Sequence, residues 1–374
     1  MMARLPLAIA PQVDRIVPYV PGKPIEEVER DLGLTETVKL ASNENPLGPS
    51  PLAVEAIRQS ARRVHRYPDG GAFYLKQRLA EALDVSPASL IVGNGSTEIV
   101  EMLAKTFLPP DGESLVSDGA FIMYRIATMA ASATCRSVPM TRGLRHDLPG
   151  LVAGIGPQTR LVFIANPNNP TGTRVSRAEL NAYFDAIPPH VLTVVDEAYR
   201  EYIDEPDYPD ATDALRAGHL VIVLRTFSKI HGLAGIRMGY GITTPAVVEA
   251  LEKVRSPFNT SAVAQAAALA ALDDAEHALR SRQANGAERA RLEAALTARG
   301  ITFVPSSANF VLMKPGPSGR DAFEALLRLG VIVRPMNGYG FPDHLRVSVG
   351  TVKENDCFLA ALDAIRRQEG IATA

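Results

Sequence analysis

The sequence predicts an α/β protein with an N-terminal arm, a large domain and a smaller α+β domain at the C-terminal end. Between residues 51 and 258, short apolar runs alternate with helical patterns, which is typical of a mostly parallel sheet sandwiched by helices. From 259 to 374, a long alanine-rich helical stretch is followed by short strands and helices. Residues 1–50 are rich in proline and polar turns, and we expect them to form an extended arm.

The strands of the large domain are predicted from runs that are apolar on both faces, namely SLIVG, SLVSD, RLVFIAN, VLTVVDEAY, LVIVLRTFSK and GYGIT. Such runs indicate strands buried between two helical layers. In sheets of this kind, ligands bind beyond the carboxyl ends of the strands. Polar residues gather at those ends, at 94–98, 166–172, 196–199 and 226–229. We therefore expect the functional site along this edge of the sheet.

The smaller domain is predicted from a change of pattern after Pro257. Residues 261 to about 299 are expected to form two helices that are divided near residue 273. The segments ITFVP, ANFVLM, VIVRP and LRVSVG read as strands, and residues 320–329 and 353 to about 367 read as helices. Strands and helices mixed in this way indicate an α+β domain.

The composition excludes several classes of protein. Of the 374 residues, 46% are hydrophobic, which is enough to fill substantial cores. Lys and Arg number 39 against 41 Asp and Glu, so the net charge of -2 offers no broad basic field for nucleic acid or an anionic membrane. Cys135 and Cys357 are too few for a disulfide framework, and their spacing suggests no metal site. The apolar run before Pro11 is too short for a signal sequence or membrane span, so we expect a cytoplasmic protein.

Lys229 lies in the segment RTFSKIHGLAGIR, directly after the apolar run VIVL. A lysine just beyond a strand end, among small residues, can reach into a cleft where the loss of water lowers its pKa. Its neutral amine is then able to condense with an aldehyde and form a Schiff base. Taken alone, Lys229 would be better interpreted as a solvated loop lysine, because most lysines are solvated. The segments described next favour the first interpretation.

Asp196 and Tyr199, in DEAY, follow the run VLTVV and reach the same edge of the sheet. If that aldehyde is carried on a pyridine ring, a carboxylate against the ring nitrogen keeps the nitrogen protonated and lets the ring act as an electron sink. Asp196 is the candidate for this role. Tyr199 is expected to donate its hydroxyl to the phenolic oxygen of the ring. Asn169, in the rigid turn NPNNPTG, is a second partner for that oxygen. Each residue alone also fits a helix cap, core packing or an ordinary turn, but the coincidence of three such segments disfavours this.

A phosphate site is predicted where GNGSTE joins the run SLIVG to a helical segment. Glycines followed by hydroxyl residues at a helix N-terminus offer free N–H groups and the positive end of the helix dipole to an anion. We expect Ser96 and Thr97 to bind the phosphate, although such residues also open many helices for structural reasons alone. Thr226 and Ser228 add hydroxyl groups, and Arg237 adds a fixed positive charge.

The turn NPNNPTG, then DEAY, RTFSK and AGIRMGY, resemble in this order the fold-type I aminotransferases. Within them the chain resembles the histidinol-phosphate aminotransferase family over nearly its whole length, in KLASNENPLGPSP, RYPDGG, GNGSTE, RSPFNTSAVAQAA, ANFVLM and VIVRPMNGYGFPDHLRVSVGT. One departure concerns Phe121, which we expect to stack on the cofactor ring. Many relatives have a tyrosine at or near this position, and a phenyl ring stacks but does not hydrogen-bond.

The resemblance implies pyridoxal 5'-phosphate (PLP) as the cofactor, attached covalently to Lys229, which also serves as the catalytic base. The cofactor ring is then held by Asp196, Tyr199 and Asn169. The phosphate is then bound by Ser96, Thr97, Thr226, Ser228 and Arg237. The resemblance also implies that Arg346 binds the substrate carboxylate, although an arginine at a strand end is by default a surface residue. Residues near the side chain or phosphate of the substrate are then Tyr19, Tyr67 and Arg334, with Tyr67 reaching in from the other subunit of a homodimer.

The reaction implied by the resemblance is transamination between histidinol phosphate and 2-oxoglutarate, giving imidazole acetol phosphate and glutamate in histidine biosynthesis. An aromatic amino-acid aminotransferase on the same scaffold would carry the same core motifs. A threonine-phosphate decarboxylase-like enzyme would also use Lys229 but would release CO2. A non-catalytic relative is disfavoured because every presumed cofactor contact is present. A nucleotide-binding dehydrogenase is disfavoured because no G-x-G-x-x-G follows a strand.

Overall fold

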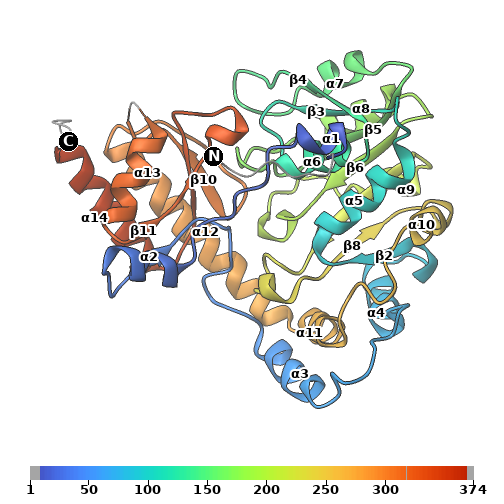
Figure 1. The fold of residues 1–374 in the computed structure, drawn as a ribbon, viewed down its shortest axis with the longest axis horizontal. Helices are drawn as coiled ribbons and strands as arrows, with labels where there is room; N and C mark the ends of the chain where they lie inside the picture. Colours follow the sequence, from blue (N-terminus) through green and yellow to red (C-terminus); the bar gives the residue numbers. More distant parts are fainter. Residues whose placement is uncertain (1–8, 317, 369–374) are drawn as a thin grey trace.

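The computed structural model describes residues 9–316 and 318–368, and its largest element is a seven-stranded sheet in the order β2-β8-β7-β6-β5-β3-β4 (Figure 1). The strands are β2 (Leu90–Gly93), β3 (Glu113–Ser117), β4 (Thr134–Val138), β5 (Thr159–Ala165), β6 (Leu192–Asp196), β7 (Val221–Thr226) and β8 (Gly239–Ile242). Strand β8 is antiparallel to β2 and β7, and the other neighbouring strands are parallel. The mostly parallel sheet predicted from the sequence is confirmed.

Two hydrophobic cores lie on the two faces of this sheet, because successive residues of a strand point to opposite sides. In β5, Val162 and Ile164 belong to one core, whereas Leu161 and Phe163 belong to the other. The helices of the first core are α3 (Pro51–Ala61), α4 (Phe73–Leu83), α7 (Leu148–Gly154), α8 (Arg177–Ala186), α9 (Thr212–Arg216) and α11 (Ala262–Leu272). The helices of the second core are α5 (Gly95–Phe107), α6 (Ile122–Ala130) and α10 (Pro245–Glu252). Helices therefore cover both faces.

A second sheet of four antiparallel strands, in the order β12-β13-β10-β9, forms the centre of the C-terminal part. Its strands are β9 (Phe303–Val304), β10 (Phe310–Met313), β12 (Arg334–Pro335) and β13 (Leu345–Ser348). The helices α12 (Ala275–Ala298), α13 (Gly319–Arg328) and α14 (Val352–Gln368) belong to this part. A separate hydrophobic core joins these helices to the sheet.

Helix α11 ends and α12 begins at the predicted break near residue 273. Although α11 follows residue 258, it packs on α3 and buries Ala264 and Ala267 in a core of the large sheet. The division of the chain into 1–50, 51–258 and 259–374 therefore remains a proposal.

The arm is not extended throughout, and the prediction is wrong for residues 25–32, which form helix α2 (Ile25–Leu32). No proline interrupts this segment, and Gly33, in the left-handed conformation at φ 66°, ends the helix. Farther along, β1 (Val38–Lys39) pairs in parallel with β11 (Val331–Ile332). In Figure 1 the blue arm crosses from the short helix α1 (Pro11–Asp14), which contacts α6, to α2 beside the C-terminal part. The arm thus spans both parts of the molecule.

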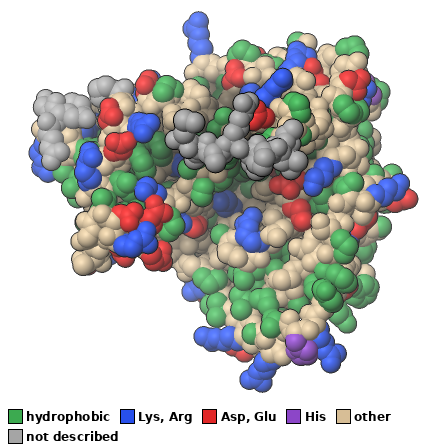
Figure 2. Space-filling model, in the orientation of Figure 1, with side chains coloured by type: hydrophobic (Ala, Val, Ile, Leu, Met, Phe, Trp, Pro, Cys, Tyr) green, Lys and Arg blue, Asp and Glu red, His purple; other side chains and the backbone are tan. Residues whose placement is uncertain are grey.

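Charged side chains of both signs are interspersed on the face of the molecule shown in Figure 2. Within the described residues, none of the helices combines the length and apolar character needed to cross a membrane. The same residues bring together no group of three or more His, Cys, Asp or Glu side chains suited to a metal ion. Both cysteines, Cys135 and Cys357, are free thiols.

Candidate active site

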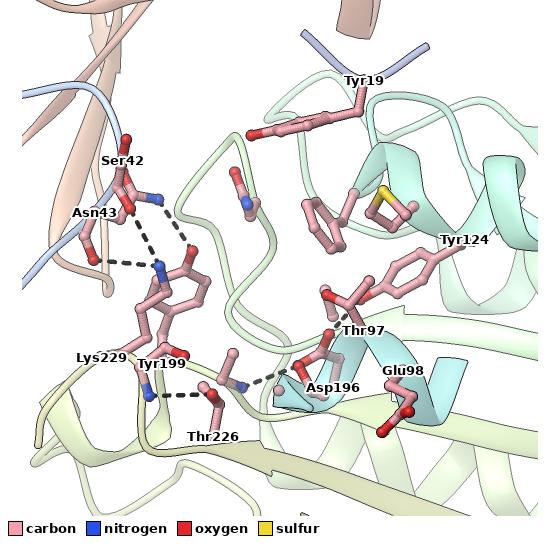
Figure 3. Close-up of a pocket in the computed structure, with 18 of the residues that line it drawn as sticks. Tyr19, Ser42, Asn43, Thr97, Glu98, Tyr124, Asp196, Tyr199, Thr226 and Lys229 are labelled. Atoms are coloured by element: carbon pink, nitrogen blue, oxygen red, sulfur yellow. Dashed lines mark hydrogen bonds between the residues drawn. The ribbon is translucent and has the colours of Figure 1, made fainter. Parts of the chain in front are cut away.

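A cavity of about 530 Å³ lies beyond the carboxyl ends of β5, β6 and β7 (Figure 3), and Arg346 of β13 lines it from the C-terminal sheet. Its lining includes the predicted residues Tyr19, Ser96, Thr97, Phe121, Asn169, Asp196, Tyr199, Thr226, Ser228, Lys229, Arg237 and Arg346. These side chains come from the arm, from several strand ends and from β13. The structure therefore brings together residues that lie far apart in the sequence, and Tyr67 and Arg334 are the predicted residues that it leaves outside this cavity.

Lys229 follows β7 and extends its amine toward the arm. Its Nζ donates to the carbonyl oxygens of Ser42 and Asn43 at 3.2 and 3.3 Å, and it lies 5.5 Å from the centre of the Tyr199 ring. Burial, assisted by the charge of Arg346, lowers the pKa of Lys229 from 10.5 to about 7. A large share of this amine is therefore neutral and nucleophilic at neutral pH.

Asp196 ends β6 in the floor of the cavity and is 7% exposed. Its Oδ2 accepts a hydrogen bond from the Tyr124 hydroxyl at 2.8 Å, and its Oδ1 accepts one from the Ala198 N–H at 3.1 Å. Burial raises the pKa of Asp196, and both donors oppose that shift because they stabilise the charged form. Sequence reasoning missed Tyr124. The signal was its spacing, because Tyr124 lies one helical turn after Phe121 and so shares its side of α6.

Tyr199 is also held by a residue that sequence reasoning missed. Its hydroxyl accepts a hydrogen bond from Asn43 Nδ2 at 3.0 Å. Asn43 is fixed in turn, because its N–H donates to Ser348 Oγ at 2.8 Å and its carbonyl accepts from Asn309 Nδ2 at 3.0 Å. Burial raises the pKa of Tyr199 to about 12, so the phenol keeps its proton at neutral pH. Tyr199 is therefore available as a donor to a ligand oxygen.

Arg346 enters the cavity from β13 of the C-terminal sheet. Its Nη1 donates to Asn169 Oδ1, and its Nη2 donates to the Ala41 carbonyl at 2.8 Å. The guanidinium lies 5.3 Å from the centre of the Phe310 ring and is 5% exposed. Among the described residues no carboxylate pairs with Arg346, and its Nε has no acceptor. A buried cation with neutral partners is a site for an anionic group of a ligand.

Arg237 lies against the N-terminus of α5. Gly95 lets the Arg237 guanidinium come close to the helix backbone, and Gly239 lets strand β8 come close to the same helix end. At Gly95, which has φ 72°, an added Cβ would lie 2.6 Å from Arg237 Nη2. At Gly239 of β8, an added Cβ would lie 2.4 Å from the Ser96 nitrogen. Arg237 Nη1 also donates to Ser228 Oγ at 3.3 Å. The helix end, the hydroxyls and the guanidinium line one side of the cavity and could hold an anion, and we call this group (Ser96, Thr97, Thr226, Ser228 and Arg237) the phosphate cradle.

Tyr67 and Arg334 do not line this cavity. The Tyr67 side chain is 82% exposed, and its ring stacks on Phe258 with the ring centres 4.7 Å apart. Arg334 donates to the Val20 carbonyl and lies 5.1 Å from the centre of the Tyr19 ring. Arg334 also lines a second cavity of about 1040 Å³, which shares Tyr19, Phe121 and Tyr339 with the first. The reach of Tyr67 into a neighbouring subunit stays a prediction.

Comparison with known proteins places this architecture in a family. The model for aminotransferase class I and II matches residues 35–362. Histidinol-phosphate aminotransferase of Anaeromyxobacter sp. (strain Fw109-5) is 50% identical over 358 residues, which cover 96% of this chain and 98% of that relative. The chain belongs to the histidinol-phosphate aminotransferase family of class I and II aminotransferases.

A second relative of this aminotransferase, histidinol-phosphate aminotransferase 2 of Methylococcus capsulatus, is 49% identical over 360 residues, 95% of this chain and 97% of the relative. The crystal structure of histidinol-phosphate aminotransferase from Sinorhizobium meliloti, in complex with pyridoxal-5'-phosphate, has a TM-score of 0.88 to this aminotransferase. It is 30% identical and covers 98% of this chain and 99% of its own. The fold expected from the fold-type I resemblance is thereby confirmed.

Proposed function

We propose that this aminotransferase uses PLP to transfer the amino group of histidinol phosphate to 2-oxoglutarate, yielding imidazole acetol phosphate and glutamate in histidine biosynthesis. The observation that carries the proposal is the position of Lys229, an amine with a pKa of about 7, in one cavity with the carboxylate of Asp196 and the guanidinium of Arg346. The relatives support the choice of substrate, because both are histidinol-phosphate aminotransferases, and the Sinorhizobium structure contains PLP.

The residues of the cavity fit the chemical groups of PLP. Lys229 offers an amine to the aldehyde, and Asp196 offers a carboxylate to the pyridine nitrogen. Tyr199 and Asn169 offer hydrogen bonds to the phenolic oxygen. The phosphate cradle offers a helix N-terminus and a guanidinium, and its tight glycine contacts leave no space for a side chain there. Phe121 offers an aromatic face to the ring.

PLP, when bound, links the substrate amine through its aldehyde carbon and draws electrons from the bond that breaks at the substrate Cα. Lys229 would be freed as a neutral amine by the incoming substrate amine and would then move the Cα proton of the substrate. Asp196 holds a proton on the ring nitrogen throughout. Tyr199 and Asn169 orient the ring by their hydrogen bonds to its oxygen. Because the 2-oxo acid reacts in the reverse sequence at the same residues, we expect ping-pong kinetics.

We propose that Arg346 and Arg334 bind different anionic groups of the substrates. Arg346 binds the α-carboxylate of glutamate and 2-oxoglutarate, because its planar donors match a carboxylate and no protein carboxylate among the described residues occupies them. Arg334 lines the adjoining cavity, beside Tyr19, and is suited to the phosphate of histidinol phosphate. The two cavities adjoin, because both are lined by Tyr19, Phe121 and Tyr339. One substrate could therefore reach Arg346 and Arg334 together.

We further propose a cytoplasmic homodimer in which Tyr67 reaches the active site of the other subunit. The exposure of an aromatic side chain as large as Tyr67 supports a partner at this surface. Mixing inactive Lys229→Ala chains with inactive Tyr67→Ala chains should restore activity, since one site of each heterodimer would carry neither lesion. No recovery would mean that Tyr67 serves its own subunit.

The reaction is tested by separating its two halves. Histidinol phosphate added to the PLP-loaded enzyme without a 2-oxo acid should change the cofactor absorbance in a single turnover. Adding 2-oxoglutarate should then restore the absorbance and release one equivalent of glutamate. Because histidinol phosphate carries no carboxylate, the decarboxylase alternative is tested with threonine phosphate, and release of CO2 from it without formation of glutamate would indicate a decarboxylase. An unchanged spectrum with every substrate would indicate a non-catalytic protein. Either result would overturn the proposal.

A further inference from the structure

The loop between α10 and α11 contains two adjacent residues, Phe258 and Asn259, that contact different parts of the molecule. Neither residue lines the cavity of about 530 Å³. Asn259 faces the segment that leads into α5, whereas Phe258 faces the exposed ring of Tyr67. This dipeptide therefore links Tyr67 to the start of α5.

Asn259 anchors the start of α5 through Glu98. Its Nδ2 donates to Glu98 Oε2 at 2.6 Å and to the Val92 carbonyl at 3.2 Å, while its Oδ1 accepts from Arg255 Nη1 at 2.8 Å. Glu98 Oε2 also accepts from the Asn94 N–H at 2.7 Å. In Figure 3 the Glu98 carboxylate is turned away from Lys229 and Asp196. Glu98 thus holds the loop at the phosphate cradle.

Phe258 holds Tyr67 from one side. The two rings stack at 4.7 Å between centres and 22° between planes, and an added Cβ at Gly70 would lie 3.6 Å from the Phe258 ring. The backbone of Phe258 has φ 56°, in the left-handed region that non-glycine residues rarely adopt. Such a conformation persists only where the neighbouring structure imposes it, and the hydrogen bonds of Asn259 supply that restraint.

We propose that Phe258 and Asn259 are positioning residues that order both halves of a composite phosphate site. Asn259 acts on the phosphate cradle of its own subunit, and Phe258 sets the direction in which Tyr67 leaves the surface toward the cradle of the second subunit. The inference rests on the proposed crossing of Tyr67. An aromatic ring that is already oriented loses less conformational freedom when it binds, so each site retains PLP better when both loops are intact.

A double-mutant cycle tests the Phe258 half, with the rate of PLP loss from the holoenzyme after dilution as the measurement. Tyr67→Phe should accelerate the loss by about tenfold, the factor expected for one hydrogen bond to a charged group. Phe258→Ala should also accelerate the loss of PLP. Phe258→Tyr, which keeps an aromatic ring at this position, should leave the rate near that of the wild-type protein. The double variant Tyr67→Phe with Phe258→Ala should be no faster than Tyr67→Phe alone.

The single and double variants distinguish the role of Phe258 from that of Tyr67. If Tyr67→Phe accelerates PLP loss while Phe258→Ala does not, or if the two effects multiply, the positioning role of Phe258 is overturned. If Tyr67→Phe itself leaves the rate unchanged, the premise that Tyr67 binds the phosphate is overturned. Asn259→Ala should still accelerate the loss in the Tyr67→Phe background, because Asn259 also acts on the cradle through Glu98. No further acceleration there would overturn the role of Asn259 at the cradle. The exposed Asn181 on α8, changed to alanine, is the matched control and should leave the rate unchanged.

Heterodimers test whether the effect crosses between subunits. A heterodimer with one Lys229→Ala chain keeps a single Lys229-linked cofactor, on the other chain. Phe258→Ala placed on the Lys229→Ala chain should accelerate loss of that cofactor, because this chain supplies Tyr67 to the intact site. The same substitution on the chain with Lys229 should leave the rate near that of the unmodified heterodimer. The reverse pattern would overturn the inference.

Discussion

Tyr124 donates its hydroxyl proton to Oδ2 of Asp196 across 2.8 Å in the buried floor of the cavity. The Tyr124 ring is held in place by Phe163, which stacks on it at 4.6 Å, and by Phe121, which meets it edge-on at 5.6 Å. Burial, with the nearby charge of Asp196, raises the pKa of Tyr124 well above its ordinary value. Tyr124 therefore remains a donor at every pH at which the enzyme is expected to work.

Tyr124→Phe keeps the ring packing and removes only this hydrogen bond. Because the hydroxyl stabilises the charged carboxylate, its loss should raise the pKa of Asp196 and move the acid limb of the kcat profile to higher pH. We expect kcat at neutral pH to fall by about tenfold or more. Tyr183→Phe is the control, since that buried hydroxyl bonds Thr193 in the core and should leave the profile unchanged. An unshifted acid limb in Tyr124→Phe would refute this role.

Lys229→Ala should abolish transamination, because no other amine lines the cavity among the described residues. Borohydride treatment of the PLP-treated variant should leave no cofactor bound to the protein, as measured by mass spectrometry. Lys76 is the matched control, since burial also lowers its pKa but it pairs with Glu252 outside the cavity. Lys76→Ala should attach PLP normally. Covalent PLP in the Lys229→Ala variant would show that the attachment point is elsewhere.

The rate of PLP attachment to the apoenzyme should depend on pH through Lys229. The reactive form is the neutral amine, so a pKa lowered to about 7 means that the rate rises with pH below 7 and levels off above it. Arg346→Gln removes a positive charge that lowers this pKa, so the midpoint should move to higher pH. Stopped-flow absorbance measures both profiles. A midpoint near the ordinary value of 10.5 in the wild-type protein would contradict the account.

Arg346 and Arg334 should differ in which half-reaction they serve. Arg346→Lys loses the paired donors that match a carboxylate, so the glutamate half-reaction should weaken by about 1.5–3 kcal/mol more than the histidinol phosphate half-reaction. Arg334→Ala should show the opposite bias. Single-turnover rates with each substrate, followed by cofactor absorbance, measure the halves separately. Equal losses in both halves for both variants would mean that the arginines share one anion site.

The sequence predicted the large sheet and the part of the cavity lining at the strand ends because local patterns encode both, whereas Tyr19 and Arg346 were expected only from the family resemblance. Strands that are apolar on both faces have a continuous signal, and their carboxyl ends meet at one edge, which placed Asp196, Asn169 and Lys229 together. Strand β4 was not predicted because it lies at the sheet edge, where its mostly solvent-accessible residues need no apolar run.

The contacts of Asn43 and Tyr124 were not predicted for a different reason, although the spacing of Tyr124 from Phe121 indicates that both lie on one side of α6. Asn43 lies 156 residues from Tyr199, and only the crossing of the arm over the cavity brings them together. Tyr124 contacts Asp196 across the interface between α6 and β6. Such pairs depend on tertiary packing, which motif order does not specify. Helix α2 was missed because the prolines around it dominate the composition of the arm.

The proposed substrate is tested most directly by kcat/KM for histidinol phosphate, measured beside phenylalanine and tyrosine with 2-oxoglutarate as the common acceptor. A phosphate bound by an arginine adds a charged hydrogen bond that neither aromatic amino acid can make, so histidinol phosphate should be favoured by about tenfold or more. Equal or higher values for phenylalanine or tyrosine would contradict the account and assign the enzyme to aromatic amino-acid transamination.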